Sequence, residues 1–236
     1  MRVAVIPARG GSKRIPRKNI RNFSGRPIIM WSIEAALQAG CFDLVVCSTD
    51  DEEIAAVATA AGASAPFRRP PALADDFTGT TEVIAHAIHE LELLGYSPSM
   101  VCCLYPTAPF IQPMDLIASL EMLESDDLDY VFPVTPYEYP VQRCLRREAG
   151  GHIKMREPEF FHVRSQDLEE YFHDAGLFYW GRANAWREKK VIFSSRSASI
   201  LLPGSRVRDI DTEDDWVIAE LLFQALLSTS SNRFGT

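Results

Sequence analysis

Short apolar segments alternate with amphipathic segments along most of the chain, and this alternation limits the folds that it can adopt. The apolar runs have the length and composition of buried strands, and the segments between them repeat apolar residues at helical spacing. The expected strands are 3–6, 44–47, 100–104, 130–134, 176–180 and 199–202, and the expected helices are 27–39, one after Thr49, 80–94, one from Pro113 and one after Asp211. Strands and helices that alternate in this way form βαβ units. We predict an α/β fold with a Rossmann-like, mainly parallel sheet and helices on both faces.

Two helix starts follow from local sequence signals. Pro27 suits the first helical position, where its missing N–H costs no hydrogen bond. Thr49 and Glu52 have the spacing of a capping box, which predicts that the second helix begins there.

Residues from about 136 to 174 interrupt the alternation. They mix prolines, charged residues and aromatic residues without a regular period, and the segment is too long for an ordinary connection. It is also too apolar for a disordered linker. We therefore predict a single domain over residues 1–228 with an inserted dimerisation arm at about 136–174, and hence a homodimer. Residues 229–236 are expected to form a disordered tail.

The first expected strand runs directly into a glycine pair surrounded by cations. Gly10 and Gly11 have no Cβ, so backbone N–H groups can turn toward a bound anion. Five basic residues lie on this loop: Arg9, Lys13, Arg14, Arg17 and Lys18. Because like charges so close together repel one another unless they share an anionic partner, we expect a triphosphate here. The alternative is a solvated basic loop without a ligand.

Asp209 and Asp211 flank a single apolar residue near the end of the chain. On a strand, both carboxylates would point to the same face. Paired carboxylates that share the ion with substrate phosphates are a common way to hold Mg²⁺. We therefore expect a Mg²⁺ site at this pair. The alternative is that Asp211, with Thr212 and Asp215, caps the last helix.

Composition and charge exclude some classes of partner. The chain has 24 Lys and Arg residues against 32 Asp and Glu residues, a net charge of −8, so we do not expect it to bind nucleic acid. No apolar run reaches the ~18 residues of a membrane span, and we expect no membrane association. The five cysteines lack the spacing of a zinc site, and three lie in strand-like runs, so we expect free thiols and a cytoplasmic location.

Several well-known functional motifs are absent. The sequence has no G-x-x-x-x-G-K-[ST] loop, no G-x-G-x-x-G turn after the first strand, no G-x-S-x-G elbow and no H-E-x-x-H pair. The first two absences argue against a P-loop NTPase and against a dinucleotide-dependent oxidoreductase.

Residues 6–19 resemble the opening motif of the CMP-nonulosonate synthetases, also called acylneuraminate cytidylyltransferases. Further similar segments follow in family order, namely 48–50, 69–70 with Leu73 and Asp76, 106–109, 164–168 and 209–212. The resemblance extends to about residue 222. It implies a fold of the nucleotidyltransferase type and a reaction in which CTP and a nine-carbon 2-keto sugar acid, a nonulosonic acid, give a CMP-sugar and pyrophosphate.

Within the family, residues 140–143, 171–176 and 178–181 are most similar to the branch that activates pseudaminic acid. The sialic acid branch usually has Gln where Tyr105 stands and Asn where Ala175 stands. The resemblance therefore implies that pseudaminic acid is preferred over N-acetylneuraminic acid.

The same resemblance assigns roles to individual residues. The nucleotide-binding set is Ala8, Arg9, Gly10, Gly11, Ser12, Lys13, Asn19, Arg69, Thr78 and Thr80. The substrate-binding set is Tyr105, Arg164, Gln166, Asp174 and Tyr179, and the catalytic set is Arg9, Lys13, Lys18, Asp209 and Asp211. Asp209 and Asp211 would carry Mg²⁺, and Arg164 would pair with the substrate carboxylate.

The sequence leaves several related functions open. A CMP-N-acetylneuraminate synthetase, a 3-deoxy-manno-octulosonate cytidylyltransferase and an enzyme that activates a sugar phosphate share the fold and the metal chemistry. A nucleotide-binding regulatory protein without catalysis is an alternative of a different class. Loss of the acidic pair or of a loop lysine would support it, yet Lys13, Lys18, Asp209 and Asp211 are all present.

Overall fold

The computed structural model describes residues 1–233, and strands alternate with helices as the sequence predicts. The strands are β1 (Arg2–Pro7), β2 (Asn22–Phe23), β3 (Arg26–Pro27), β4 (Leu44–Ser48), β5 (Met100–Leu104), β6 (Tyr130–Pro136), β7 (Leu145–Arg147), β8 (Ile153–Met155), β9 (Phe172–Asp174), β10 (Phe178–Arg182) and β11 (Ser197–Leu201). The helices are α1 (Ile28–Ala39), α2 (Glu52–Ala60), α3 (Thr80–Leu93), α4 (Pro113–Ser125), α5 (Ala183–Arg187) and α6 (Glu213–Arg233). Every expected strand and helix is present, with bounds that differ by a residue or two.

The central sheet is mainly parallel, as predicted. Its strand order is β11-β6-β10-β5-β1-β4, and β9 pairs with the end of β6. β1 runs parallel to β4 and β5, and β11 runs parallel to β6, whereas β10 runs antiparallel between β5 and β6. The carboxyl ends of the parallel strands and the amino end of β10 therefore share one edge of the sheet. In an open α/β sheet this is the edge at which ligands bind.

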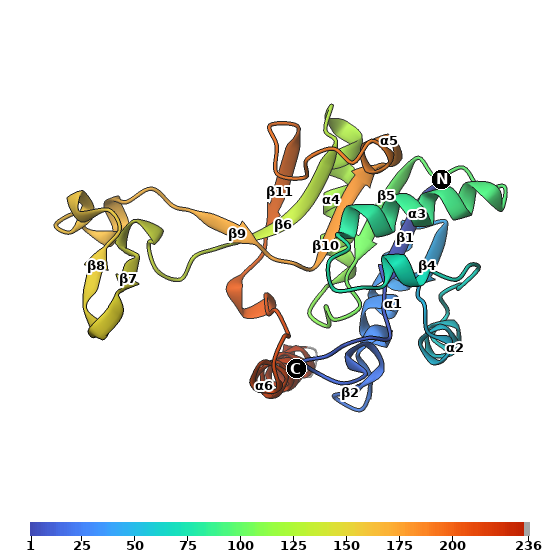
Figure 1. Cartoon of the computed structure of the whole chain (residues 1–236), viewed down its shortest axis with the longest axis horizontal. Helices are drawn as coiled ribbons and strands as arrows, with labels where there is room; N and C mark the ends of the chain where they lie inside the picture. Colours follow the sequence, from blue (N-terminus) through green and yellow to red (C-terminus); the bar gives the residue numbers. More distant parts are fainter. Residues whose placement is uncertain (234–236) are drawn as a thin grey trace.

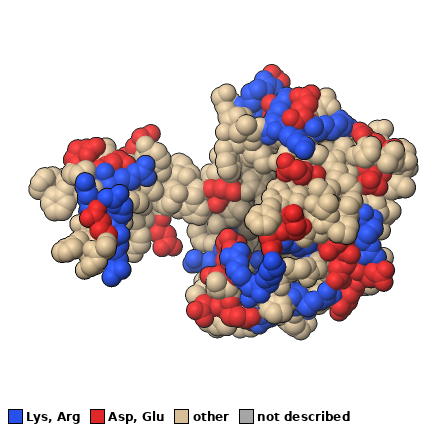
Figure 2. Space-filling model, viewed as in Figure 1, with Lys and Arg blue, Asp and Glu red and all other residues tan. Residues whose placement is uncertain are grey.

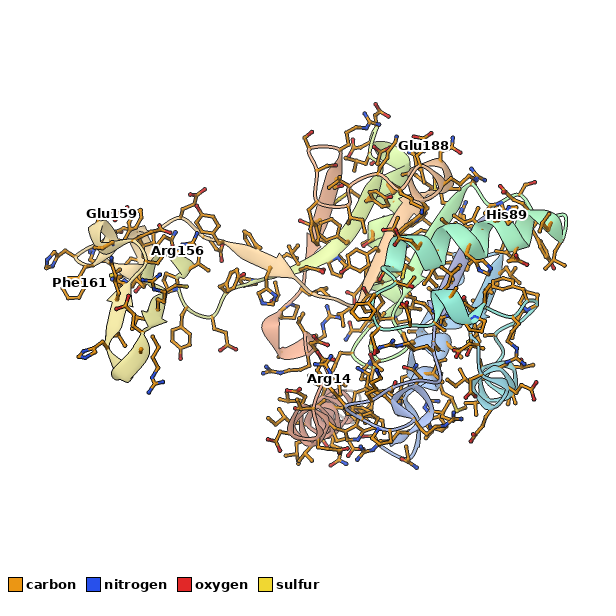
Figure 3. The ribbon with its side chains drawn as sticks, in the orientation of Figure 1. Arg14, His89, Arg156, Glu159, Phe161 and Glu188 are labelled. Carbon is orange, nitrogen blue, oxygen red and sulfur yellow. The ribbon has the colours of Figure 1, made fainter. Side chains whose placement is uncertain are left out.

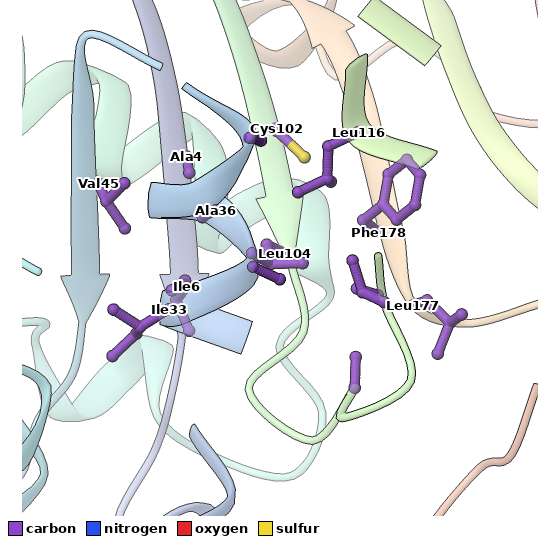
Figure 4. Close-up of a cluster of buried hydrophobic side chains, with 14 of the residues drawn as sticks. Ala4, Ile6, Ile33, Ala36, Val45, Cys102, Leu104, Leu116, Leu177 and Phe178 are labelled. Atoms are coloured by element: carbon purple, nitrogen blue, oxygen red, sulfur yellow. The ribbon is translucent and has the colours of Figure 1, made fainter. Parts of the chain in front are cut away.

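Helices cover both faces of the sheet (Figure 1). Ala4 and Ile6 of β1 pack toward Ile33 and Ala36 of α1, on the face that also receives α2 and α4 (Figure 4). Alternate residues of β1, such as Val3, pack on the opposite face, where α3 and α5 lie. This two-residue alternation, with apolar side chains on both sides, is what a strand buried on both faces requires.

A third apolar cluster joins the last helix to the segment after β1. Ile15, Phe23, Phe110, Trp216 and Phe223 are all buried in it. The cluster fixes α6 beside the segment that follows β1 (Figure 1). Helix α6 runs to Arg233, and residues 234–236 lie outside the described residues, so the tail expected at 229–236 stays a prediction.

Two predicted helix starts need correction. Asp51, rather than Thr49, caps α2: its side chain accepts a hydrogen bond from the N–H of Ile54, three residues on. Thr49 is buried, and its hydroxyl instead accepts a hydrogen bond from the N–H of Asp51. Pro27 occupies the capping position before α1, one residue earlier than expected.

The irregular segment forms an arm that stands away from the rest of the chain (Figure 1). The chain leaves the sheet through β6 and returns through β9, which pair with each other antiparallel. Between them, β7 and β8 form a hairpin in which Leu145 pairs with Met155. None of the helices within residues 1–233 combines the length and the apolar character that a membrane crossing requires.

Candidate active site

The loop after β1 is shaped by contacts from the neighbouring strand ends. Asn19 Nδ2 donates a hydrogen bond to the carbonyl of Arg9 at 2.9 Å, and the N–H of Gly10 donates to Asp50 Oδ1 at 3.0 Å. A Cβ on Gly10 would lie 2.7 Å from Asp51 Oδ2 and 3.1 Å from Asp51 Cβ. Glycine is therefore required at position 10 for close approach to the next strand, as well as for any contact with a ligand.

All five cations of this loop are paired with acidic side chains. The pairs are Arg9 and Lys13 with Asp76, Arg14 and Lys18 with Asp211, and Arg17 with Asp51 and Glu53. Four of the five cations thus gather on two aspartates from distant parts of the chain. The charges of the loop are compensated internally, as the density of like charge demands.

A polar cavity of about 440 Å³, here called the loop cavity, lies beside the loop. The predicted nucleotide-binding residues that line it are Arg9, Ser12, Asn19, Arg69, Thr78 and Thr80. Lys18 and Asp211 line it as well. The other four predicted nucleotide-binding residues, Ala8, Gly10, Gly11 and Lys13, belong to the same loop but are not among the lining residues.

Arg69 is the buried cation of the loop cavity, with only 3% of its surface exposed. Its Nε and Nη2 atoms are buried without a hydrogen-bond partner, and the nearest carboxylate oxygen, Asp50 Oδ1, lies 3.9 Å from Nη2. Burial lowers the pKa of this guanidinium from its usual value, although the charge of Asp50 acts in the opposite direction. Buried donors are nearly always satisfied, so these atoms indicate that the cavity receives an acceptor group.

A second cavity of about 1120 Å³, here called the large cavity, adjoins the first. Tyr105 lines both cavities, while Asp174 and Tyr179 line the large one. The Tyr179 hydroxyl donates to Asp174 Oδ2, and the N–H of Gly176 donates to Asp174 Oδ1 at 3.0 Å. The Tyr105 hydroxyl lies 3.1 Å from Thr80 Oγ1, a residue of the loop cavity, so Tyr105 links the two cavities.

Both tyrosines are neutral hydrogen-bonding groups at physiological pH. Burial raises the pKa of Tyr105 to about 12. Burial, together with the charge of the neighbouring Asp174, raises the pKa of Tyr179 well above its usual value. A neutral phenol both donates and accepts hydrogen bonds, as the hydroxyls of a sugar do.

The two predicted metal-binding aspartates lie where the cavities meet. Asp209 lines the large cavity and Asp211 lines the loop cavity. The strand geometry that would point both carboxylates to one face is not present, because residues 207–211 form an irregular segment after β11. Burial and the neighbouring charge of Asp211 raise the pKa of Asp209, while Lys18 and Arg14 act in the opposite direction.

Asp211 does not cap the last helix with its carboxylate. That carboxylate lies 2.9 Å from Arg14 Nη1 and 3.4 Å from Lys18 Nζ. Thr212 and Asp215 cap the helix reciprocally: Thr212 Oγ1 accepts from the backbone N–H of Asp215 at 3.2 Å, and Asp215 Oδ2 accepts from the backbone N–H groups of Thr212 and Asp211 at 2.8 and 3.2 Å. The capping alternative is therefore wrong for the side chain of Asp211, which faces the cations of the loop.

The acidic pair is the candidate for a metal site. Within residues 1–233, no group of three or more His, Cys, Asp or Glu side chains is placed to hold a metal ion. A metal at this site would therefore take its remaining ligands from a substrate or from water.

Two of the predicted sugar-binding residues, Arg164 and Gln166, do not reach the large cavity. Both are exposed on the arm, and Arg164 Nε pairs with Asp167 Oδ2 at 2.7 Å.

Two residues that the sequence analysis did not assign also belong to the site. Arg143 lines the large cavity, and its Nε is buried without a partner. Asp76 lines the loop cavity and contacts both Arg9 and Lys13. Both fall within segments on which the family resemblance rests, but no motif of their own marked them as functional.

A glycine-containing cationic loop that follows the first strand, borders a polar cavity and contacts one member of an aspartate pair defines the site of a nucleotidyltransferase. The chain belongs to the family described as Cytidylyltransferase, whose sequence profile matches residues 3–197. The resemblance inferred from the sequence is thereby confirmed, and the chain is an enzyme of the nucleotidyltransferase class.

Characterised relatives are similar over nearly the whole chain. The pseudaminic acid cytidylyltransferase of Campylobacter jejuni (serotype O:2) is 44% identical over 222 residues, which cover 94% of this chain and 96% of that protein. The CMP-N,N'-diacetyllegionaminic acid synthase of Legionella pneumophila is 34% identical over 229 residues, which cover 94% and 96%.

Solved structures share the fold at low sequence identity. The CMP:2-keto-3-deoxy-manno-octonic acid synthetase complexed with CTP superposes with a TM-score of 0.69 at 18% identity, covering 97% of this chain and 99% of that one. The 4-diphosphocytidyl-2C-methyl-D-erythritol synthase of Anaerococcus prevotii superposes with a TM-score of 0.56 at 12% identity, covering 94% and 98%.

Proposed function

We propose that this enzyme transfers the cytidylyl group of CTP to a nine-carbon 2-keto sugar acid, with pseudaminic acid as the preferred substrate. The observation that carries the proposal is the meeting of two cavities at Asp209 and Asp211. The loop cavity carries the cations that a triphosphate needs, and the large cavity carries the neutral hydroxyls that a polyol needs. The names of the relatives from Campylobacter jejuni support the identity of the sugar.

The triphosphate binds along the loop after β1. Arg9, Lys13 and Lys18 neutralise its charge, while the backbone N–H groups of residues 10–12 offer additional donors. Asn19 supports this arrangement because its side chain holds the carbonyl of Arg9.

The cytosine base binds on the opposite side of the loop cavity. Arg69 supplies buried donors that lack a partner in the protein, and the cytosine carbonyl is an acceptor that fits them. Thr78 and Thr80 place hydroxyl groups beside it.

Asp209 and Asp211 hold a Mg²⁺ ion together with the phosphates of CTP. Their chemistry fits this ion: Mg²⁺ is usually bound by one or two carboxylates plus substrate phosphates and water, and Asp211 borders the cavity of the loop cations while Asp209 borders the adjoining large cavity. When bound, Mg²⁺ neutralises charge that develops on the phosphates and lowers the pKa of the attacking hydroxyl.

The reaction is an in-line displacement at the α-phosphorus of CTP. The anomeric hydroxyl oxygen of the sugar acid forms a bond to that phosphorus, the bond to the bridging oxygen of the β-phosphate breaks, and pyrophosphate leaves. The hydroxyl proton passes to solvent. The cations of the loop stabilise the negative charge that develops on the leaving pyrophosphate.

The sugar acid binds in the large cavity. Tyr105, Tyr179 and Asp174 contact its hydroxyl groups from within the chain, and Arg143 is a cation that borders the same space. Arg164 and Gln166 act from the arm of a second subunit, where Arg164 pairs with the substrate carboxylate.

The arm is proposed to form the contact of a homodimer. Its large apolar side chains are exposed: Tyr139 is 80% exposed, Ile153 and Phe161 are each 66% exposed, and Leu145 is 60% exposed. Figure 3 shows Phe161 at the outer end of the arm, far from the sheet. Exposed apolar side chains concentrated on a projecting segment are typical of an interaction surface.

Tyr105 and Ala175 decide between the candidate sugars. Both line the large cavity, at positions where the sialic acid branch carries amides. Without those amides, the site lacks partners for the polar groups of N-acetylneuraminic acid. A missing buried hydrogen bond costs about 1–3 kcal/mol, or roughly ten- to hundredfold in discrimination per contact.

The cysteines bear on a different question, the compartment in which the enzyme works. All five are free thiols, and we expect the enzyme to work in the cytoplasm, where they stay reduced.

Pyrophosphate release tests the proposal directly. The protein is incubated with Mg²⁺, with each of CTP, UTP, ATP and GTP, and with pseudaminic, N-acetylneuraminic or 3-deoxy-manno-octulosonic acid. We expect release only with CTP, and at least a tenfold higher kcat/KM for pseudaminic acid. Equal turnover with UTP or ATP would contradict the cytidine assignment. A preference for either other acid would overturn the sugar assignment and leave the class of reaction intact.

A further inference from the structure

Asp76 occupies the anion-binding position of the loop after β1. Its Oδ1 lies 2.8 Å from Arg9 Nη1, and its Oδ2 lies 2.5 Å from Lys13 Nζ. Arg9 Nη1 also donates to the carbonyl of Asp75 at 2.5 Å. Within residues 1–233, Asp76 is the one carboxylate that pairs with Arg9 or Lys13. These two cations are therefore compensated by a single side chain of the protein itself.

Asp76 lies on a short turn that precedes α3 and borders the loop cavity. Asp75 shapes this turn locally, because its Oδ1 accepts hydrogen bonds from the N–H of Phe77 and from the N–H and hydroxyl of Thr78. The side chain of Phe77 is 94% exposed and packs against nothing that would fix the turn. The contacts with Arg9 and Lys13 thus tie the turn to the loop, and a ligand that takes these cations also releases the turn.

A phosphate chain and Asp76 compete for the same cations. Hydrogen bonds from Lys13 and Arg9 lower the pKa of Asp76, so its carboxylate is charged wherever the enzyme would act. A phosphate group that binds Arg9 and Lys13 brings its own negative charge to the same place. Two anions at this distance repel, so Asp76 must move away when the phosphate binds.

We propose that Asp76 is an internal competitor for pyrophosphate, which weakens the hold of the loop on this product and promotes its release. The inference rests on the proposed function for the identity of the product, but the competition is a property of the loop itself. When pyrophosphate leaves, Asp76 returns to Arg9 and Lys13, and the charges of the loop are again compensated. The Asp76 carboxylate thereby sets the affinity of the cationic loop for pyrophosphate.

Direct binding of inorganic pyrophosphate tests this inference. The wild-type protein and the Asp76→Asn variant are titrated with pyrophosphate by calorimetry at fixed ionic strength. Two partly exposed ion pairs contribute modestly, so we expect the dissociation constant to fall about three- to tenfold in the variant. The Asp76→Glu variant keeps the competing charge and is expected to bind pyrophosphate about as weakly as the wild type.

Glu53 provides the matched control. It pairs with Arg17 of the same loop, but it does not line the loop cavity. Glu53→Gln changes the net charge by the same amount as Asp76→Asn, so it measures the general effect of one lost negative charge. We expect its dissociation constant for pyrophosphate to stay within about twofold of the wild type.

The outcomes separate the two proposals. Unchanged or weaker pyrophosphate binding by Asp76→Asn, with an unchanged thermal midpoint, would overturn the inference, as would an equal gain in Glu53→Gln. Because the titration needs neither CTP nor a sugar acid, tighter binding by Asp76→Asn alone upholds the competition even if no turnover is found. If turnover is found but Asp76→Asn binds no tighter, the proposed function stands and the role of Asp76 is wrong.

Discussion

At the scale of single residues, Arg69 differs from the loop cations because it is buried and its Nε and Nη2 lack hydrogen-bond partners. Its neighbour Arg68 has 46% of its side chain exposed and pairs with Glu52 at 3.1 Å. The two adjacent arginines therefore allow a comparison in which the lost charge is the same and only the position differs.

We predict that Arg69→Ala weakens CTP binding by about 30- to 100-fold, because a hydrogen bond to a charged group contributes roughly 1.5–3 kcal/mol. Arg68→Ala should leave CTP binding nearly unchanged. Calorimetric titration of both variants with CTP measures the difference. Equal affinities would show that Arg69 does not contact the nucleotide.

Asp129 gives the enzyme a stability that depends on pH. Burial by itself would raise the pKa of its carboxyl, but hydrogen bonds from Arg196 and Lys190 outweigh burial, and the pKa lies below its usual value. A carboxyl with a lowered pKa in the folded state stabilises that state above its unfolded pKa. The contribution is lost as the pH falls through the folded pKa.

We therefore predict that Asp129→Asn lowers the free energy of unfolding by about 2 kcal/mol at pH 7 and by progressively less as the pH falls below about 4. Urea unfolding at several pH values measures both effects. Asp127, which also pairs with Arg196 but is 89% exposed, is the control: Asp127→Asn should cost much less at pH 7. A constant difference between wild type and Asp129→Asn down to pH 3 would contradict the argument.

At the scale of elements, the segment that carries the acidic pair is irregular, yet it is fixed at several points. Before it, Arg206 forms a forked, largely buried pair with Asp115 of α4, at 2.6 and 3.1 Å. Within it, Lys18 Nζ donates to the carbonyl of Ile210 at 2.6 Å. These contacts position Asp209 and Asp211 without a strand.

We predict that Arg206→Ala destabilises the fold by about 3–5 kcal/mol, because it leaves Asp115 buried without its partner. The same variant should raise the Mg²⁺ concentration needed for half-maximal activity by more than threefold, since the acidic pair loses an anchor. Arg206→Lys keeps the charge and should recover part of both losses. A thermal melt and a Mg²⁺ titration measure them, and an unchanged Mg²⁺ requirement would limit Arg206 to a structural role.

Regular elements could be predicted from the sequence better than the residues that join them. The strands followed from apolar runs such as 100–104, because burial on both faces leaves a clear pattern. The capping role of Asp51 and the irregular path of residues 207–211 depend on contacts with other parts of the chain, so no local pattern marks them. Arg143 was missed for the same reason: it lines the large cavity while its guanidinium is held by Val163 and Ser165, 20 and 22 residues further along the chain.

The candidate site likewise has features that could be predicted from the sequence and features that depend on contacts between distant residues. The loop cations and the acidic pair were predicted because their charges are dense and close in sequence. The structure adds that Asp76 and Asp211 compensate these cations, and each aspartate lies more than sixty positions along the chain from the cations that it pairs with. The positions of Arg164 and Gln166 relative to a sugar depend on a second subunit and stay a prediction.

At the scale of the whole molecule, the arm and the remainder of the chain present different surfaces. Basic and acidic side chains are intermixed over the face seen in Figure 2, without a large patch of one sign. The arm exposes several large apolar side chains within one short segment, among them Leu145 and Ile153 on the hairpin, whereas exposed apolar side chains such as Leu93 are spread over the rest of the chain.

We predict that the double substitution of Leu145 and Ile153 by Asp converts a dimer into a monomer and removes most of the activity, because the arm then no longer completes the partner's sugar site. Sedimentation velocity and pyrophosphate release on the same samples measure the two effects. Leu93 is 70% exposed on α3, and Leu93→Asp is the control that should change neither. A fully active wild-type monomer at assay concentration would refute the coupling.

The reactivity of two cysteines in the central sheet can report how often the layers on its two faces open locally. Cys102 and Cys103 are neighbours on β5, so one thiol points into the layer under α1 and α4 and the other into the layer under α3. Burial raises the pKa of both thiols far above the usual range, so neither reacts until its layer opens.

Alkylation followed by mass spectrometry should therefore modify exposed Cys144 within minutes and the two buried thiols only over hours, at rates set by local opening. If the two layers open independently, Cys102 and Cys103 will be modified at different rates although they are adjacent in the chain. Equal rates would mean that the sheet opens as a single cooperative unit. Modification as fast as that of Cys144 would contradict the burial of both. Two adjacent residues thus allow the opening rates of the layers on the two faces of β5 to be measured separately, without any engineered label.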